Sequence, residues 1–368
     1  MEDSKEEIQR FQFSTDNKFI LVSNDQGFGI INSDPKYALP DMKIREVGNI
    51  QQCQNINNII AYVRGGDACP GRELYIYDDY HNRDASKILF KSQIKSLKIS
   101  INCLLVIFEE KAYLFSFKTE DNSKWKEPKL VKKFITCKNE KGIGCLHSFR
   151  RRNLVILPGK TENSIQIYDC KEGEEIKEYD LGEKPDILSG NIHGEVFAYA
   201  NETGMEINVH KISDGTLYNK YYRGKKTSQI TSIEFDRGCN RLACCSQSDT
   251  VHVYSLGTEL AMNGRDSEEA KDSLLMSESA IDGSTVSTVL EARENPKSSI
   301  LGFFSTQSEQ SYLKVYIKSP EKSIAIIDNQ LHILTQDGKM HYIDIQLEGS
   351  YWEDYPQVQK IDLMKKNE

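Results

Sequence analysis

A short basic stretch stands out in an otherwise acidic chain. The segment YNKYYRGKKTSQITSIEF occupies residues 218–235 and places Arg223, Gly224, Lys225 and Lys226 in a row. An arginine guanidinium can donate two parallel hydrogen bonds to a phosphate, and lysines add point charges. Glycine lets the backbone turn closely. The stretch therefore predicts a binding site for a phosphorylated group.

Two arginine-containing stretches also have a structural interpretation. Arg223 could form a salt bridge with a carboxylate at a strand end, and the sequence leaves this alternative open. A second basic group, HSFRRRN at residues 147–153, lies in the turn before the apolar run LVILPG. We interpret Arg150, Arg151 and Arg152 as a solvated basic turn, with phosphate binding as the alternative.

Strands must position the basic stretch. Seven apolar hairpins bounded by turn residues recur along the chain, mostly at the spacing of ~40 to 50 residues that is typical of four-stranded β-propeller blades. They are KFILVSNDQGFGIINSD, NIIAYVRGG with RELYIYDD, CLLVIFEEKAYLFSF, NLVILPGKTENSIQIYD, EVFAYANETGMEINVHKISDG, RLACCSQSDTVHVYSL and SIAIIDNQLHILTQDGKMHYIDI. The sequence predicts an all-β fold, a seven-bladed WD40-like β-propeller, in which the basic stretch links the fifth and sixth blades.

We expect one propeller domain over residues 9–364, interrupted by a long acidic insertion at residues 257–310. The insertion lies between the sixth and seventh hairpins, is rich in Ser, Glu and Asp, and is expected to be partly disordered. Residues 259–294 hold nine acids and three bases, a charge of −6, so the rest of the chain carries −2 of the total of −8. A basic face is thus compatible with the acidic total, whereas broad nucleic-acid binding is disfavoured.

Composition and motifs narrow the class of protein. With 368 residues, 38% hydrophobic and 28% charged, the chain resembles soluble globular proteins. Its apolar runs, such as LLVIF, fall far short of the ~20 residues of a membrane span. The start MEDSKEEIQRFQF is neither a signal peptide nor a transit peptide, so we expect a cytosolic protein.

Catalytic and metal-binding signatures are not found in the sequence. Nine cysteines without CxxC or Cys/His zinc spacing indicate reduced, mostly buried thiols. Seven histidines are spread over the predicted blades, and neither a nucleophile beside a base nor a P-loop is present. We expect a non-enzyme without a cofactor or metal.

From about Phe11 to Ile345 the chain resembles the PROPPINs, seven-bladed propellers that bind polyphosphoinositides in autophagy and endosomal traffic. FSTDNKFILVSNDQGFGIINSDP resembles the family's first blade, FKSQIKSLKI with FEEKAYLFSF its third, and NEKGIGCLHS with LPGKTENSIQIYD its fourth. The family's Phe-Arg-Arg-Gly motif reads Tyr221-Tyr222-Arg223-Gly224 here, so its first arginine is missing. ITSIEFDRGCNRLACCSQSDTVHVYSL continues in the family's register.

The resemblance implies two head-group pockets, one on each side of this motif. Adjacent residues of an extended segment point to opposite sides, so two arginines can serve two pockets. The pocket beside the sixth blade is retained as Arg223, Ser246, Thr250 and His252. Hydroxyls and a histidine can donate hydrogen bonds to phosphate.

The pocket beside the fifth blade departs from the family pattern. The family's hydroxyl and basic residues fall on Tyr199, Asn201 and Asn208, its histidine falls near Gly182, and Tyr222 replaces the arginine. The sequence therefore predicts one intact site and one degenerate site. Lys225 and Lys226 are expected to add general attraction to an anionic surface, worth about 1 kcal/mol per cation.

The acidic insertion stands where the resemblance implies a membrane-dipping loop. Its apolar island ILGFF supplies the insertion candidates Ile300, Leu301, Phe303 and Phe304, and LLM at residues 274–276 is a second island. ILGFF could equally pack against the ring, and the serine-rich loop could serve as a phosphorylated regulatory arm.

Together these observations predict a peripheral membrane protein. It would bind phosphatidylinositol 3-phosphate or the 3,5-bisphosphate on preautophagosomal, endosomal or vacuolar membranes, and recruit an autophagy-type protein partner through its blade edges. The segment RGGDACPGRE at residues 64–73 is a candidate partner loop. The rival interpretation is a WD40-like interaction scaffold that has lost lipid binding.

Overall fold

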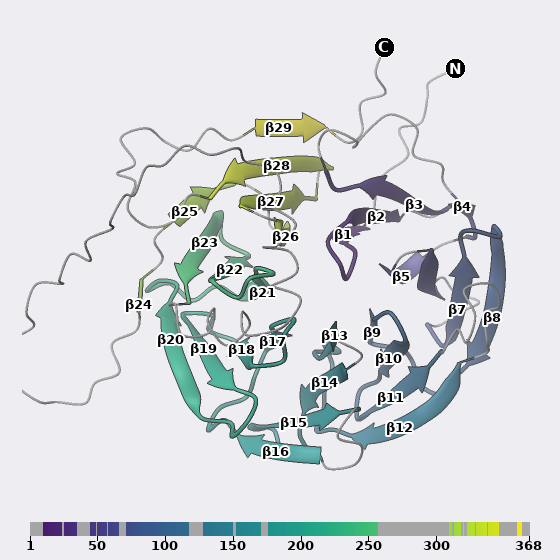
Figure 1. The fold of residues 1–368 in the computed structure, drawn as a ribbon, viewed down its shortest axis with the longest axis horizontal. Coiled ribbons are helices and arrows are strands. Elements are labelled where there is room, and N and C mark those ends of the chain that lie inside the picture. The colour runs from purple at the N-terminus through teal and green to yellow at the C-terminus, as the bar shows by residue number, and fades with distance from the viewer. Residues whose placement is uncertain are drawn as a thin grey trace, which may run out of the picture.

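Seven sheets arranged as a ring make up the computed structural model of this chain (Figure 1). The structure describes residues 10–23, 26–34, 45–48, 50–56, 58–65, 71–117, 128–149, 152–170, 176–256, 309–310, 313–317, 319, 322–327, 329–336, 338–345 and 359–362. Each sheet is one blade, with its first strand nearest the centre and its fourth strand at the rim (Figure 1). The prediction of an all-β, seven-bladed β-propeller is confirmed.

Blades 1 to 4 each contain four consecutive antiparallel strands. Blade 1 has β1 (Arg10–Phe13), β2 (Phe19–Ser23), β3 (Gly27–Asn32) and β4 (Arg45–Glu46). Blade 2 has β5 (Ile50–Ile56), β6 (Ile59–Arg64), β7 (Glu73–Asp78) and β8 (Arg83–Leu89). Blade 3 has β9 (Ser96–Ile99), β10 (Cys103–Ile107), β11 (Lys111–Ser116) and β12 (Lys129–Ile135). Blade 4 has β13 (Cys145–Phe149), β14 (Arg152–Pro158), β15 (Ser164–Asp169) and β16 (Ile176–Asp180).

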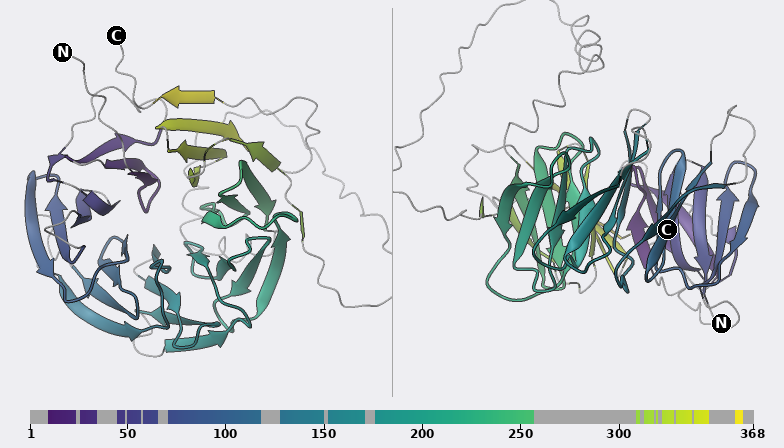
Figure 2. Two further views of the ribbon diagram at one scale, coloured as in Figure 1. Left: turned by 180° about the vertical axis from the view of Figure 1, so that it is seen from behind. Right: turned by 90° about the horizontal axis from the view of Figure 1, so that it is seen from below.

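Blades 5 to 7 complete the ring. Blade 5 has β17 (Ile187–Gly190), β18 (Val196–Ala200), β19 (Glu206–Lys211), β20 (Leu217–Tyr222) and a fifth, parallel strand, β24 (Glu309–Gln310). Blade 6 has β21 (Ile230–Phe235), β22 (Arg241–Ser246), β23 (Thr250–Ser255) and β25 (Leu313–Tyr316). Blade 7 has β26 (Lys322–Ile327), β27 (Gln330–Thr335), β28 (Lys339–Asp344) and β29 (Gln359–Asp362). In the edge-on view of Figure 2 the strands run between the two faces of the ring.

The predicted insertion falls inside blade 6, between its third and fourth strands. Apart from Glu309 and Gln310, residues 257–310 lie outside the described residues, so the predicted disorder and the domain span of residues 9–364 stay predictions. Where the chain is described again, β24 pairs with β20 at Tyr221 and Tyr222. The end of the insertion therefore lies beside the tyrosines that precede Arg223.

Apolar side chains between neighbouring blades form the core. Each of seven buried clusters joins two adjacent blades, and burial of this surface is the main force that holds the ring together. The cluster between blades 7 and 1 closes the ring, with Ile20 and Val22 packed against Leu334 and Met340. The cluster between blades 5 and 6 includes Tyr221, two residues before Arg223.

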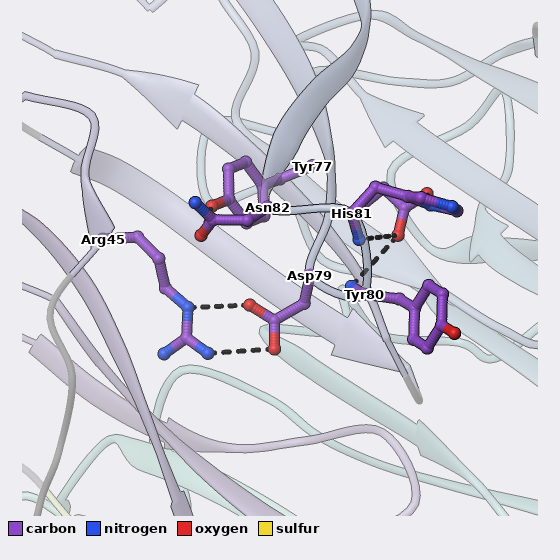
Figure 3. A network of polar contacts seen from close by, with 7 residues as sticks. Arg45, Tyr77, Asp79, Tyr80, His81 and Asn82 are labelled. Atoms are coloured by element: carbon purple, nitrogen blue, oxygen red, sulfur yellow. Dashed lines mark hydrogen bonds and ion pairs between the residues drawn. The ribbon is translucent and has the colours of Figure 1, made fainter.

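A bidentate ion pair joins the rims of blades 1 and 2 (Figure 3). Nε of Arg45 on β4 donates to Oδ1 of Asp79 at 2.7 Å, and the terminal nitrogen Nη2 donates to Oδ2 at 2.9 Å. Asp79 belongs to the β7–β8 turn, in which Asp78 accepts hydrogen bonds from the backbone of Tyr80 and His81. The pair is therefore a tether between two sheets rather than a contact within one.

We predict that Arg45→Met lowers the free energy of unfolding by about 1.5–3 kcal/mol, because hydrogen bonds to charged groups with limited exposure contribute that much. The side chains of Arg45 and Asp79 are only 15% and 25% exposed. The matched control is Lys87→Met, which breaks a pair with Glu73 whose lysine is 50% exposed. It should cost clearly less, because exposed ion pairs are screened by solvent. If urea unfolding showed the same loss of unfolding free energy for Arg45→Met and Lys87→Met, the Arg45–Asp79 pair would not be a stabilising link between the blades.

Candidate functional site

Arg223 lies directly after β20, where the chain passes from blade 5 to blade 6. Its backbone N–H donates to the carbonyl of Met205 at 2.8 Å. Its side chain is 7% exposed and donates from Nε to the carbonyl of Gly204 and from Nη2 to the carbonyl of Lys226. A buried cation is tolerated when it is hydrogen-bonded in this way. Among the described residues, Arg223 forms no ion pair. Backbone carbonyls therefore hold its side chain, and not the carboxylate that the structural interpretation of the sequence assumed.

The acceptor Gly204 must be glycine. It sits in the β18–β19 turn with φ +57°, a conformation that side-chain-bearing residues rarely adopt. A Cβ there would lie 2.2 Å from the carbonyl oxygen of Ser228. The close approach of these two turns therefore fixes the carbonyl that orients the Arg223 guanidinium.

A row of hydroxyls lies on the face of blade 6. Ser246 Oγ and Ser248 Oγ are 2.7 Å apart, Ser248 Oγ and Thr250 Oγ1 are 2.9 Å apart, and His252 Nε2 is 3.2 Å from Thr250 Oγ1. Ser248 is held in the β22–β23 turn because its backbone N–H donates to Ser228 Oγ at 3.0 Å. The structure thus brings Ser246, Thr250 and His252 together as predicted, and adds Ser248, which was not predicted.

Two residues of β25 extend the same face outwards. Thr250 pairs with Tyr316 and His252 pairs with Lys314 across the antiparallel ladder, so these side chains share one side of the sheet. Lys314 and Tyr316 are both exposed, and the Lys314 ammonium lies 5.2 Å from the centre of the Tyr316 ring. Lys314 is therefore a further cation on the same side of the sheet as Thr250 and His252.

The electrostatics of this face favour an anion. Burial, together with the positive charges of Lys314 and Arg223, lowers the pKa of His252 to about 4. Two cations therefore act on one imidazole, which is neutral at pH 7. Asp249 stands between Ser248 and Thr250 in the β22–β23 turn, and its side chain is exposed. Its charge acts on Lys322, whose ammonium donates to the carbonyls of Ser248 and Ser319.

The predicted residues differ in how accessible they are. Ser246 is completely buried and His252 nearly so, whereas Thr250 and Ser248 are half-buried, so a ligand that enters from outside meets Thr250 and Ser248 first. Lys225 and Lys226 are exposed. These four side chains and Lys314 form the accessible part of the site.

Gly224 is not needed for a close backbone turn, the role that its residue type suggested. Its φ is not in the left-handed region, and a Cβ there would meet no atom within 4 Å. The backbone turn therefore does not require glycine. What the glycine leaves is open space beside Arg223.

The fifth-blade side of the motif carries a carboxylate. Asn201 Nδ2 donates to Glu183 Oε2 at 2.6 Å, and Asn208 Nδ2 donates to Glu183 Oε1 at 2.9 Å. Tyr199 is buried beside them, and burial together with Glu183 raises the pKa of its phenol above the usual range. Glu183 follows Gly182, the position that aligns near the family's histidine, and the sequence analysis did not single it out. A negative charge held at this point repels phosphate.

Several predicted features lie outside the described residues. Among them are the membrane-insertion candidates Ile300, Leu301, Phe303 and Phe304, and the LLM island. Arg150 and Arg151 also lie outside, between the end of β13 and the start of β14. So do residues 66–70, the middle of the candidate partner loop at residues 64–73.

The described residues contain neither a group of three or more potential metal-binding side chains nor a helix long and apolar enough to span a bilayer. The eight described cysteines, all except Cys69, are free thiols.

Comparison with known proteins places these observations in a family. The sequence profile of the PROPPIN family matches residues 61–324. Autophagy-related protein 18e of Arabidopsis thaliana is 22% identical over 247 residues, which cover 65% of this chain and 63% of that protein. The match therefore spans less than two thirds of that relative's length.

Two solved structures share the fold. Kluyveromyces lactis Hsv2 superposes with a TM-score of 0.69 at 18% identity, over 96% of this chain and 97% of that one. KlAtg21, solved in complex with the coiled-coil of AgAtg16, superposes with a TM-score of 0.65 at 15% identity, over 93% of this chain and 95% of that one. At these identities the likeness establishes the fold alone.

The low pKa of His252 predicts a specific pH dependence of stability. Between about 4 in the folded chain and the ordinary 6.5, the unfolded chain binds more protons, so stability rises with pH. This contribution is complete above pH 6.5 and is lost as the pH falls through about 4. We predict that the unfolding free energy of His252→Gln falls less steeply over this window, by up to about 1.4 kcal/mol per pH unit. If urea titrations gave the same pH dependence of the unfolding free energy for wild type and His252→Gln, the pKa of His252 would not be lowered in the folded protein.

Proposed function

The chain belongs to the PROPPIN family, and from that membership we propose that it is a non-catalytic peripheral membrane protein that binds a 3-phosphorylated inositol lipid. The lipid is phosphatidylinositol 3-phosphate or the 3,5-bisphosphate. The head group binds on the blade 6 side of the Tyr221-Tyr222-Arg223-Gly224 motif.

One observation supports this proposal above the others: the positive charges of Arg223 and Lys314 both act on His252, which ends a row of three hydroxyls. A phosphate oxygen between them would accept hydrogen bonds from the guanidinium and from Thr250 or Ser248. Hydrogen bonds from charged donors to phosphate are among the strongest in proteins. Ser246 would act through Ser248 as a positioning residue, because its own hydroxyl is buried.

The second pocket is proposed to be inactive towards lipid. Glu183, held by Asn201 and Asn208, places a negative charge where an anionic head group would bind, and Tyr222 supplies no cation. The protein would therefore use one head-group site, as the sequence predicted.

A single head group holds a protein on a membrane only weakly, so a second signal is needed. The exposed Lys225 and Lys226 would add attraction to an anionic surface, at about 1 kcal/mol each. Tyr316 is 72% exposed beside Lys314 and suits the membrane–water interface, where aromatic side chains with a polar end concentrate. Ile300, Leu301, Phe303 and Phe304 of the insertion remain candidates for contact with the acyl region.

The cellular role follows from the relatives. We propose an effector or scaffold in autophagy or endosomal membrane traffic, at preautophagosomal, endosomal or vacuolar membranes. The complex of KlAtg21 with a coiled-coil supports a protein partner that binds at the blade edges.

The second candidate function is a WD40-like interaction scaffold that has lost lipid binding. The bonds of Arg223 to the carbonyls of Gly204 and Lys226 favour it, because they give this arginine a structural role without any ligand. The two functions differ in whether the accessible cation Lys314 contributes to membrane binding.

Flotation with liposomes at physiological salt separates these two functions. Wild type should float with vesicles that contain phosphatidylinositol 3-phosphate or the 3,5-bisphosphate and not with plain vesicles. Arg223→Ala should abolish flotation. Lys314→Ala, at an exposed position where the fold is not at risk, should weaken it about fivefold, as expected for one cation near the surface.

The matched controls are Arg151→Ala in the fourth-blade turn and Lys177→Ala, an exposed lysine on β16. Both should float like wild type. If wild type ignores both lipids, or if Lys177→Ala and Lys314→Ala lose equal affinity, the lipid site is wrong and the scaffold function is favoured.

Removal of the Glu183 carboxylate beside the fifth blade should strengthen lipid binding. We predict that Glu183→Gln binds the same vesicles about two- to tenfold more tightly, the range of about 0.4–1.4 kcal/mol expected for one charge pair near a surface. Glu162→Gln is the control, because Glu162 is exposed on the neighbouring turn and changes the net charge equally. Equal gains for both variants would mean that Glu183 acts only through net charge.

A further inference from the structure

A polar cavity lies at the centre of the ring, among the inner strands of blades 1, 2 and 3. Its volume is about 260 Å³, and residues of β1, β2, β5 and β9 together with Lys95 line it. These strands are on the other side of the ring from blades 5 and 6, which carry the proposed lipid site (Figure 1). We refer to it as the central cavity. It is separate from the lipid site.

Three cations line the central cavity: Arg10, Lys95 and Lys98. Its lining contains no Asp or Glu among the described residues. Lys95 lies 4.0 Å from Glu109, at the limit of an ion pair, and Glu109 is shared with Lys138. Neither Arg10 nor Lys98 forms an ion pair within the described residues. Three like charges that line one cavity repel one another, and a bound anion would relieve this repulsion.

Hydrogen-bonding groups accompany the cations. Ser23 and Ser96 supply hydroxyls to the lining. The side-chain oxygens of Gln51 and Gln52 are buried and lack a hydrogen-bond partner in the described structure. Buried polar atoms are normally satisfied, so these two acceptors leave room for a donor, such as a water molecule that accompanies an anion. Rotation of the Gln51 amide would present its NH₂ group to an acceptor instead.

One carboxyl group acts on Lys98 from across the ring. Burial raises the pKa of Glu234, on β21 of blade 6, to about 7, and the charge of Lys98 opposes that rise. Burial of the ring together with the charge of Lys98 lowers the pKa of the half-buried His147 on β13 to about 4. At neutral pH His147 is therefore uncharged and Glu234 is only partly ionised. The positive charge of the central cavity is not cancelled.

We propose that the central cavity is a second anion site, which takes a small soluble compound with one or two phosphate groups. Arg10, Lys95 and Lys98 would neutralise the phosphate charge, and Ser23 and Ser96 would donate hydrogen bonds to its oxygens. The volume is below the roughly 300–1,000 Å³ of sites for drug-sized ligands, which limits the ligand to a compact polyanion. The site is independent of the proposed lipid function.

Pyrophosphate is a suitable probe because it is small, soluble and carries no lipid. Isothermal titration calorimetry on the full chain at low salt should show saturable binding to wild type that weakens as salt is added. Lys98→Gln and Arg10→Gln should each weaken this binding about tenfold or more. Arg10 is exposed, so its replacement keeps the test valid if Lys98→Gln fails to fold.

Two controls distinguish the central cavity from the lipid site. Lys177→Gln, on the outer strand β16, should bind pyrophosphate like wild type. Arg223→Ala should also retain pyrophosphate binding, while Lys98→Gln should retain flotation with phosphatidylinositol 3-phosphate vesicles. The proposal is overturned if wild type does not bind pyrophosphate at millimolar concentrations, if Lys98→Gln and Arg10→Gln bind normally, or if Arg223→Ala abolishes the binding.

Discussion

A buried arginine that is hydrogen-bonded but not neutralised determines the chemistry of this propeller. Arg223 is held by the carbonyls of Gly204 and Lys226, which satisfy two of its five side-chain N–H groups without cancelling its charge. Had a carboxylate taken their place, the positive potential on the blade 6 face would be lost. Burial keeps the imidazole of His252 neutral, and the charges of Lys314 and Arg223 add to this effect. The ring of blades serves to bring these groups from β20, β23 and β25 to one place.

The sequence was informative about those strands whose two faces are both buried. Six of the seven predicted hairpins are the two middle strands of a blade, and the seventh covers β26, β27 and β28. Their residues are apolar on both sides, as in β10 and β18, because each sheet packs between two neighbours. Rim strands such as β8 and β12 are largely exposed, and their sequences are as polar as those of loops, so they were not predicted. The pairing of β24 with β20 had no sequence signal, because it joins positions far apart in the chain.

For the site, residue type and local spacing indicated Arg223, while the resemblance supplied Ser246, Thr250 and His252. Ser248 could have been found, since SQSDT alternates three hydroxyl residues on one side of a turn. Lys314 could not, because the insertion separates it from His252 along the chain and only the ladder of β23 and β25 brings them together. The importance of Glu183 could likewise not be predicted from the sequence. The sequence placed it in a loop, and its significance depends on the amides of Asn201 and Asn208 that hold it.

The most direct test of the central claim is to measure the pKa of His252 by NMR with and without inositol 1,3-bisphosphate, the soluble head group of phosphatidylinositol 3-phosphate. Without ligand the account predicts a pKa of about 4. A bound phosphate would offset the charges of Arg223 and Lys314, so the pKa of His252 should rise on binding, and it should not rise in Lys314→Ala to the same extent. If saturating head group leaves the pKa of His252 unchanged while the other histidines are also unaffected, no phosphate binds on this face and the account is wrong.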